Sequence, residues 1–197
     1  HALQLQLRWL GIAAISGVLG AMVYQYHLAT ISEAFDYVGQ EISNALMLTG
    51  IYLALTLTVF LLNRPSSPQQ RRRLAASMAA AVSLGIIREG SEIIIYVSSF
   101  LQQDNLLNIG IGGTIGTAIG TSLAALSYYT LVSLRTPWLM LAGQWLLALI
   151  AAAMLSQAIQ FLIQADWLPA QQALWASTWL ISEESETGHL LYAIAGY

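Results

Sequence analysis

Three charged residues stand close together inside one long apolar run of the chain. Segment 86–95 reads IIREGSEIII and contains Arg88, Glu89 and Glu92. On a helix, Glu89 and Glu92 share a face because they are three residues apart. Two converging carboxylates supply the oxygen ligands that hard, highly charged cations prefer. The spacing therefore predicts a cation site with Glu89 and Glu92 as its metal ligands.

The residues between and beside these carboxylates are expected to support the site. Arg88 precedes Glu92 by four residues, so the two can form an ion pair that offsets part of the negative charge of the empty site. Gly90 removes a side chain, so another helix or a partly dehydrated ion can approach. Ser91 could offer a further oxygen, although a serine in a membrane helix more often bonds its own backbone. Alternatively, Arg88 and Glu92 form only a structural lock between helices.

The composition indicates an integral membrane protein. Of the 197 residues, 57% are hydrophobic and 9% are charged, whereas a soluble domain carries about 25% charged residues. The chain has no Cys and no Lys, which excludes thiolate metal sites and makes a nucleic-acid partner improbable. It has no phosphate-binding loop, nucleophile triad or zinc helix motif. We therefore expect a protein that is not an enzyme.

Five stretches are long and apolar enough to span a bilayer, which takes roughly 20 residues. They cover residues 8–27, 38–62, 74–101, 106–134 and 138–163. We expect one membrane domain over 1–197, an all-α polytopic transmembrane helical bundle. The charged trio falls at the middle of 74–101, near the bilayer centre, where charges are costly and are usually functional. Residues 164–197 are predicted to form an outer, extracytoplasmic interfacial segment, with a helix over 169–181.

The loops carry their charges asymmetrically. Six of the seven arginines lie at the ends of the predicted spans on one side, at positions 8, 64, 71–73 and 135. The positive-inside rule makes that side cytoplasmic, which predicts a multi-pass protein of the cell (inner) membrane. The other side carries Glu33, Asp36, Asp104, Asp166, Glu183, Glu184 and Glu186. These acids are either simply solvated or attract cations, and Glu183, Glu184 and Glu186 are candidates for receiving the ion.

The glycine pattern suggests an internal repeat. Gly11 matches Gly110 and Gly17 matches Gly116, both at an offset of 99 residues. Such symmetry is typical of transporters built from inverted repeats. We expect repeats of three helices each, in which the partner of 74–101 would be a helix preceding residue 1.

The motif Arg-Glu-Gly-x-Glu at 88–92 resembles the signature of the oxidase-dependent iron permease family, the high-affinity ferric iron transporters of bacteria and fungi. The arginine cluster at 71–73, the glycine-rich stretch 106–134 and the closing run GHLLYAIAGY at 188–197 extend the resemblance over nearly the whole chain. Members have seven helices and carry this motif in the first and the fourth. The chain resembles helices two to six, with 74–101 as the fourth, and lacks a first and a last helix.

The resemblance implies a permease that moves ferric iron, with iron as substrate and no tightly bound cofactor. It implies membrane lipid, iron and an oxidase or periplasmic iron-delivery protein as partners. Members often carry an acid where Glu41 stands, so Glu41 is a candidate for the route of the arriving ion. The chain departs from the family at Ser91, where a bulky apolar residue is common, and at Gln157, Gln160 and Gln164, near which members carry acids and a His. The alternatives are a permease for another cation, such as ferrous iron or lead, and a non-transporting scaffold with an Arg–Glu lock.

Overall fold

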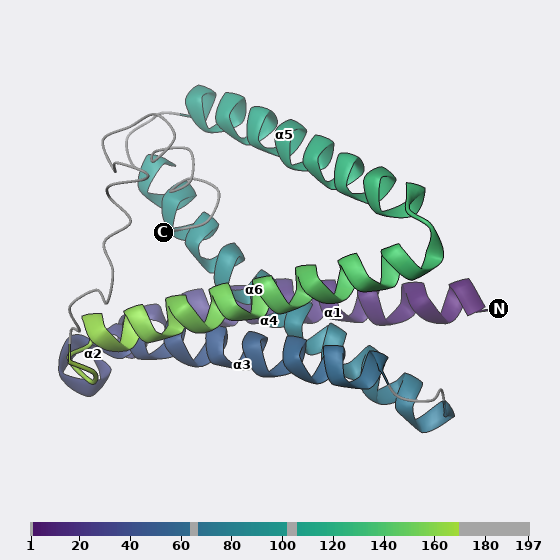
Figure 1. The fold of residues 1–197 in the computed structure, drawn as a ribbon. Coiled ribbons are helices and arrows are strands. Elements are labelled where there is room, and N and C mark those ends of the chain that lie inside the picture. Colours follow the sequence, from purple (N-terminus) through teal and green to yellow (C-terminus); the bar gives the residue numbers. More distant parts are fainter. Residues whose placement is uncertain (1, 64–66, 102–105, 170–197) are drawn as a thin grey trace, which may run out of the picture.

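The chain is helical throughout the part that the structure describes. The computed structural model describes residues 2–63, 67–101 and 106–169. These residues form six helices and no strand (Figure 1). The helices are α1 (Ala2–Tyr26), α2 (Leu28–Tyr37), α3 (Gly39–Leu62), α4 (Pro68–Leu101), α5 (Leu106–Ser133) and α6 (Thr136–Gln164). The all-α prediction is thereby confirmed for the described residues.

Four of these helices are long and apolar enough to cross a membrane. The qualifying stretches are Arg8–Tyr26, Gly39–Leu62, Leu106–Ser133 and Trp138–Gln164. Helix α4 has 34 residues and is the longest of the six, but it does not belong to this group because Arg88, Glu89 and Glu92 interrupt its apolar run. Length and composition alone therefore support four spans, one fewer than the five we expected.

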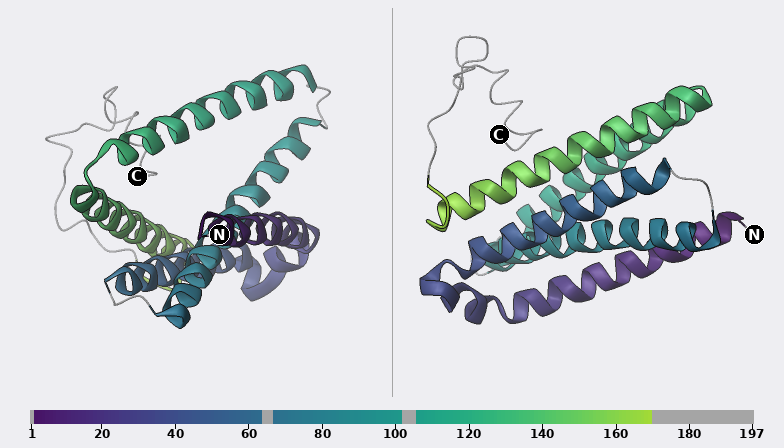
Figure 2. Two further views of the ribbon diagram at one scale, coloured as in Figure 1. Left: turned by 90° about the vertical axis from the view of Figure 1, so that its right-hand side faces the viewer. Right: turned by 60° about the horizontal axis from the view of Figure 1, so that its bottom comes forward.

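The helix packing centres on α3 and α4. Helix α4 packs along α1 and α3, and α3 also packs along α6. Helix α5 stands apart from α1 and α3 (Figure 1; left view of Figure 2) and has no buried residue. The buried core consists mostly of alanines, with Leu48 of α3 the largest apolar side chain that is fully enclosed. Small residues at these interfaces let the helix backbones approach closely, as membrane helices commonly do.

Hydroxyl groups tie the three main helices together. The pairs that join two helices are Thr58 Oγ1 with Ser77 Oγ at 2.9 Å, Ser16 Oγ with Ser83 Oγ at 2.6 Å, and Tyr24 Oη with Ser43 Oγ at 2.6 Å. Hydrogen bonds of this kind between membrane helices contribute about 0.6 kcal/mol each on average. Their contribution to the total stability is therefore small, and their main effect is to determine which faces of α1, α3 and α4 meet.

The short helix α2 reverses the chain between α1 and α3, and the sequence did not predict it. Its last residues have left-handed backbone angles, with φ of 55° at Phe35, 61° at Asp36 and 70° at Tyr37. This conformation costs roughly 1–2 kcal/mol per non-glycine residue. The ring of Phe35 packs edge-to-face on Trp167, just beyond the end of α6, with centroids 6.0 Å apart. This contact offsets part of that cost and holds the turn against α6.

A larger side chain at Gly17 is expected to separate α1 from α4. A Cβ atom at Gly17 would lie 2.7 Å from Ile86 Cβ, whereas a Cβ at Gly11 on the same helix would meet nothing within 4 Å. Overpacking a tight contact costs about 1–3 kcal/mol. Gly17→Leu should therefore lower the melting temperature of the purified protein in detergent by several degrees, and Gly11→Leu should not. Equal melting temperatures for the two variants would contradict the α1–α4 packing described here.

Candidate metal site on helix α4

The charged trio forms one ion-paired group in the second half of α4. Arg88 Nη1 donates a hydrogen bond to Glu89 Oε1, and Arg88 Nη2 lies 3.4 Å from Glu92 Oε1. A single guanidinium thus touches both carboxylates. The sequence predicted the Arg88–Glu92 pair from the four-residue spacing, but it did not predict the contact with Glu89. The group carries one positive and two negative charges, so it keeps a net negative charge that a cation can satisfy.

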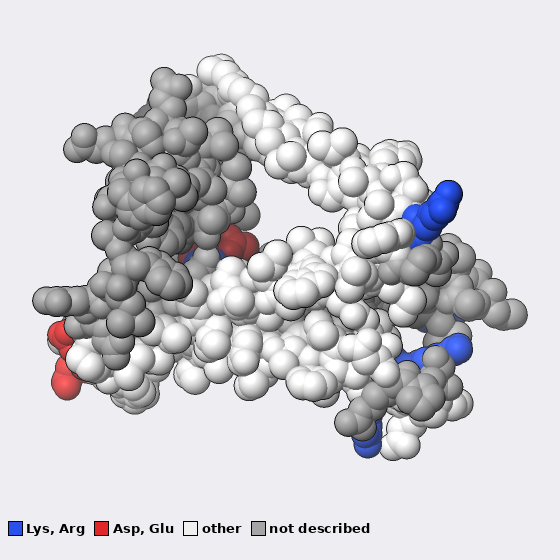
Figure 3. Space-filling model, viewed as in Figure 1, with Lys and Arg blue, Asp and Glu red and all other residues white. Residues whose placement is uncertain are grey.

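The two carboxylates differ from the arginine in their exposure. The side chain of Arg88 is 16% exposed, that of Glu92 is 34% exposed and that of Glu89 is 62% exposed. In the space-filling view, acidic atoms are visible in the recess that α5 and α6 frame in front of α4 (Figure 3). The arginine therefore lies against the protein, while both carboxylates remain accessible to an ion.

Helix α1 holds α4 near the carboxylates, and Gly90 makes this possible. A Cβ at Gly90 would lie 3.1 Å from Ala21 Cβ, so a residue with a side chain here would crowd α1. Ser91 is buried, and its hydroxyl donates to the backbone oxygen of Arg88 at 2.7 Å. The sequence allowed Gly90 to admit either another helix or an ion, and the structure shows the close approach of α1. It also allowed Ser91 to offer its oxygen to the ion or to its own backbone, and the structure shows the backbone bond. Both residues thus support the site by fixing the helix that carries it.

Glu89 and Glu92 are not joined by other typical metal ligands in the described part of the chain. Residues 2–63, 67–101 and 106–169 contain no group of three or more His, Cys, Asp or Glu side chains that could hold a metal ion. Glu41 therefore does not share a cluster with Glu89 and Glu92. Hard cations take about six oxygen ligands. Two carboxylates supply only part of that shell, so other oxygen donors, such as water, have to complete it.

The other predicted residues lie away from this group or outside the described residues. Glu41 stands in the first turn of α3, and its Oε2 atom is buried with no hydrogen-bond partner among the described residues. Glu183, Glu184 and Glu186 lie outside the described residues, as does the helix expected over 169–181. The structure therefore shows that Glu41 has a buried acceptor oxygen. The roles of Glu183, Glu184 and Glu186 in receiving the ion stay predictions from the sequence.

Two further buried oxygens lie outside the predicted metal site, and of the two residues only Gln157 was singled out in the sequence, as an amide where the family carries acids nearby. Gln25 Oε1 on α1 and Gln157 Oε1 on α6 are buried, and neither has a hydrogen-bond partner among the described residues. Leaving a buried polar atom without a hydrogen-bond partner costs about 1–3 kcal/mol. Such atoms are therefore usually bound by a water molecule or an ion. The signal in the sequence was an amide within an apolar run, which alone does not show whether the side chain faces lipid or protein.

Comparison with known proteins places these helices in a family. The model of the family described as "Iron permease FTR1 family" matches residues 55–197, which include all of α4, α5 and α6. No curated protein and no solved structure matches the chain. The match covers well over half of the sequence and includes the motif at 88–92, and the apolar helices agree with a multi-pass membrane protein. The chain belongs to the iron permease FTR1 family, a family of iron transporters.

Proposed function

We propose that this protein carries ferric iron across the cell membrane and that Glu89 and Glu92 ligate the ion near mid-membrane. The observation that carries the proposal is the pairing of two accessible carboxylates with one guanidinium inside α4, within the region that matches the iron permease family. Ferric iron is a hard, trivalent ion and suits carboxylate oxygens. Iron is the cargo, and its passage needs no tightly bound cofactor.

In this proposal α4 also crosses the membrane, as a fifth span, although it carries three charged residues. Charged side chains inside a membrane are tolerated when they pair with one another and face the protein interior or a water-filled cavity. Arg88 pairs with both glutamates, and the side chains of Glu89 and Glu92 are 62% and 34% exposed, which gives their oxygens access to water. Arginines cluster at one end of the molecule and acids at the other (Figure 3), so the arginine-rich end is cytoplasmic by the positive-inside rule.

The direction of the helices supports an inverted repeat. Gly17 of α1 meets Ile86 of α4, and Gly90 of α4 meets Ala21 of α1, so α1 and α4 run in the same direction. Helix α5 returns from the end of α4 and therefore runs opposite to α1 (Figure 1). The two halves of an inverted repeat cross the membrane in opposite directions. If α5 is the repeat of α1, the two helices must therefore run in opposite directions, as they do.

Arg88 acts in this proposal as a built-in counter-ion. In the empty site its guanidinium neutralises one of the two carboxylate charges, which lowers the cost of keeping them away from bulk water. An arriving cation has to displace the guanidinium from at least one carboxylate. A trivalent ion gains more from two carboxylates than a divalent ion does, so this exchange favours ferric iron.

The acidic end of the molecule is the side on which the ion arrives. Glu41 offers a buried oxygen without a partner at the start of α3, and the amide oxygens of Gln25 and Gln157 add further unpartnered acceptors. Glu183, Glu184 and Glu186 would receive the ion outside the membrane. A ferric ion is poorly soluble when free, so an oxidase or a periplasmic iron-binding protein would deliver it.

The identity of the ion is tested by uptake of radioactive iron in cells that express the permease. Iron offered in the ferric form, or as ferrous iron together with an oxidant, should be taken up. Ferrous iron kept reduced by ascorbate should be taken up far less, because the site is matched to a trivalent ion. Faster uptake of reduced iron, or of lead, would instead identify a permease for a divalent cation.

A further inference from the structure

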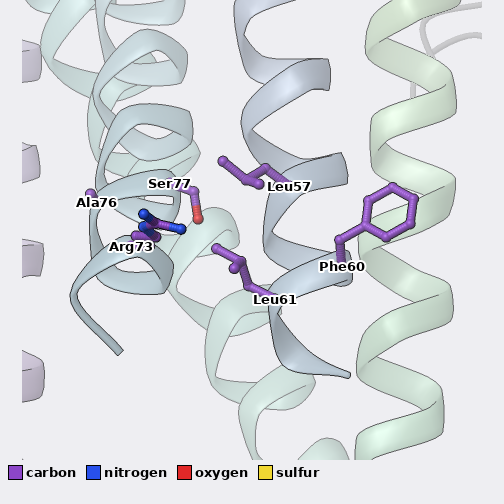
Figure 4. A pocket seen from close by; sticks show the side chains of 6 residues that line it. All are labelled: Leu57, Phe60, Leu61, Arg73, Ala76 and Ser77. Atoms are coloured by element: carbon purple, nitrogen blue, oxygen red, sulfur yellow. The ribbon is translucent and has the colours of Figure 1, made fainter. Parts of the chain in front are cut away.

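A groove lies between α3 and α4 at the end of the molecule that carries the arginines. It has a volume of about 480 Å³ and is lined by Leu57, Phe60, Leu61, Arg73, Ala76 and Ser77. Figure 4 shows the side chains of Leu57 and Leu61 from α3 facing the start of α4, with the guanidinium of Arg73 beside Ser77. The groove is thus an apolar surface with one cation at its edge.

The polar atoms of the groove other than Arg73 already have partners. The hydroxyl of Ser77 bonds Thr58 Oγ1 at 2.9 Å and donates to the backbone oxygen of Leu74 at 2.9 Å. Leu57 and Phe60 are exposed, at 49% and 64%, so the groove opens on the outer surface of the helix pair. A ligand would therefore find hydrocarbon along the wall and would have only Arg73 available for a charged contact.

Arg73 lacks an acidic partner in the part of the chain that the structure describes. The ion pairs found there involve Arg88 alone. Arg73 lies two turns or less from the start of α4, and the apolar part of the helix follows it directly. This position corresponds to the level where a membrane helix leaves the hydrocarbon and meets the headgroups. Basic pockets between helices at this level recognise anionic lipid headgroups.

We propose that this groove binds one anionic phospholipid, with the lipid phosphate on Arg73 and an acyl chain along Leu57, Phe60 and Leu61. Charge complementarity selects an anionic headgroup, and the apolar wall selects an acyl chain rather than a soluble anion. The bound lipid lies against the Thr58–Ser77 contact between α3 and α4. The site is distinct from the carboxylates of α4, and its failure would leave the proposed iron transport unaffected.

Native mass spectrometry of the purified protein tests the proposal with defined lipids. The protein in detergent is titrated with phosphatidylglycerol and, separately, with phosphatidylcholine that has the same acyl chains. Phosphatidylglycerol should bind more tightly. Arg73→Gln should weaken it about five-fold, which corresponds to the loss of about 1 kcal/mol per arginine at a membrane surface. Inorganic phosphate at the same concentration should not displace the lipid, because it has no acyl chain.

Two further variants separate the groove from general surface charge. Arg71→Gln makes the same change of charge two residues away and outside the groove, so it should alter phosphatidylglycerol binding much less than Arg73→Gln does. Ala76→Phe fills the groove at an exposed position without changing charge and should weaken binding of the lipid. Equal losses in Arg73→Gln and Arg71→Gln, or equal binding of the two lipids, would overturn the proposal. Dimers that disappear in Ala76→Phe would show that a second copy of the chain occupies the groove instead.

Discussion

Replacing Glu89 and Glu92 together with glutamine is expected to abolish iron uptake while the protein still inserts and accumulates in the membrane. Glutamine keeps the size of the side chain and one oxygen, but it removes the charge that holds the cation. A bond to a charged group contributes about 1.5–3 kcal/mol, so the loss of two such ligands should lower uptake on the order of 100-fold or more. The measurement is uptake of radioactive iron per molecule of permease in the membrane.

A matched control shows that the position of the carboxylates matters. Glu33 on α2 is exposed and lies outside the charged trio. Glu33→Gln therefore makes the same chemical change without touching the proposed site and should leave uptake nearly unchanged. Normal uptake by the Glu89→Gln/Glu92→Gln protein would remove these residues from the transport pathway. Loss of the protein from the membrane, with normal uptake by what remains, would favour the structural lock.

Removing Arg88 alone is expected to destabilise the protein, and removing its partner as well is expected to restore it. Arg88→Gln leaves Glu89 and Glu92 without the guanidinium that contacts both. Breaking a fully buried ion pair costs about 3–5 kcal/mol, but Glu92 is 34% and Glu89 62% exposed, so water screens the pair and we expect a smaller loss of about 1 kcal/mol. The double variant Arg88→Gln/Glu92→Gln has the same net charge at the motif as the native protein. Glu89 stays charged without its partner, but its side chain is 62% exposed and remains hydrated. The double variant should therefore regain most of the melting temperature and the membrane level of the native protein but not its iron uptake.

This pair of variants separates the two interpretations of the motif. A purely structural lock predicts that a stable double variant retains whatever activity the protein has. A cation site predicts that the double variant is stable and inactive, because one ligand is gone. Native stability for Arg88→Gln would show that the two carboxylates need no counter-ion. Native uptake by the double variant would show that Glu92 is not a ligand.

The long apolar helices could be predicted from the sequence. Their ends could be predicted only where the helix stops at the same residue as the apolar run. The predicted ranges 38–62 and 106–134 differ by one residue from α3 and α5. Helices α1 and α4 each begin six residues before the predicted start. The added turns of α4 are polar and read PQQRRR, whereas those of α1 read ALQLQL and alternate glutamine with leucine. Pro68 suits the first position of α4, where its missing N–H leaves no bond unmade.

The turn between α1 and α3 could not be predicted because its backbone angles contradict the residue types. Left-handed angles favour glycine and asparagine, whereas Phe35 and Tyr37 have bulky rings. The contact of Phe35 with Trp167 brings together residues far apart in the sequence. Gly39 is required where the chain enters α3, since a side chain there would collide with the backbone oxygen of Ile31. Tertiary packing therefore decides the conformation of this segment.

The site was predictable in its residues and less so in its contacts. The spacing predicted that Glu89 and Glu92 share one side of a helix and that Arg88 can reach Glu92. Adjacent residues of a helix do not face each other, so the contact of Arg88 with Glu89 depends on the length of the arginine side chain. The burial of the acceptor oxygens of Gln25, Glu41 and Gln157 depends on how α1, α3 and α6 pack, which the local sequence does not encode.

Iron bound by the purified protein tests the role of the carboxylates most directly. The protein is incubated with ferric iron held by a weak chelator, separated from free iron by gel filtration, and analysed for metal per chain. The native protein and Glu33→Gln should retain iron in equal amounts, and Glu89→Gln/Glu92→Gln should retain almost none. Equal retention of iron by the native protein and by Glu89→Gln/Glu92→Gln would contradict the assignment of Glu89 and Glu92 as its ligands.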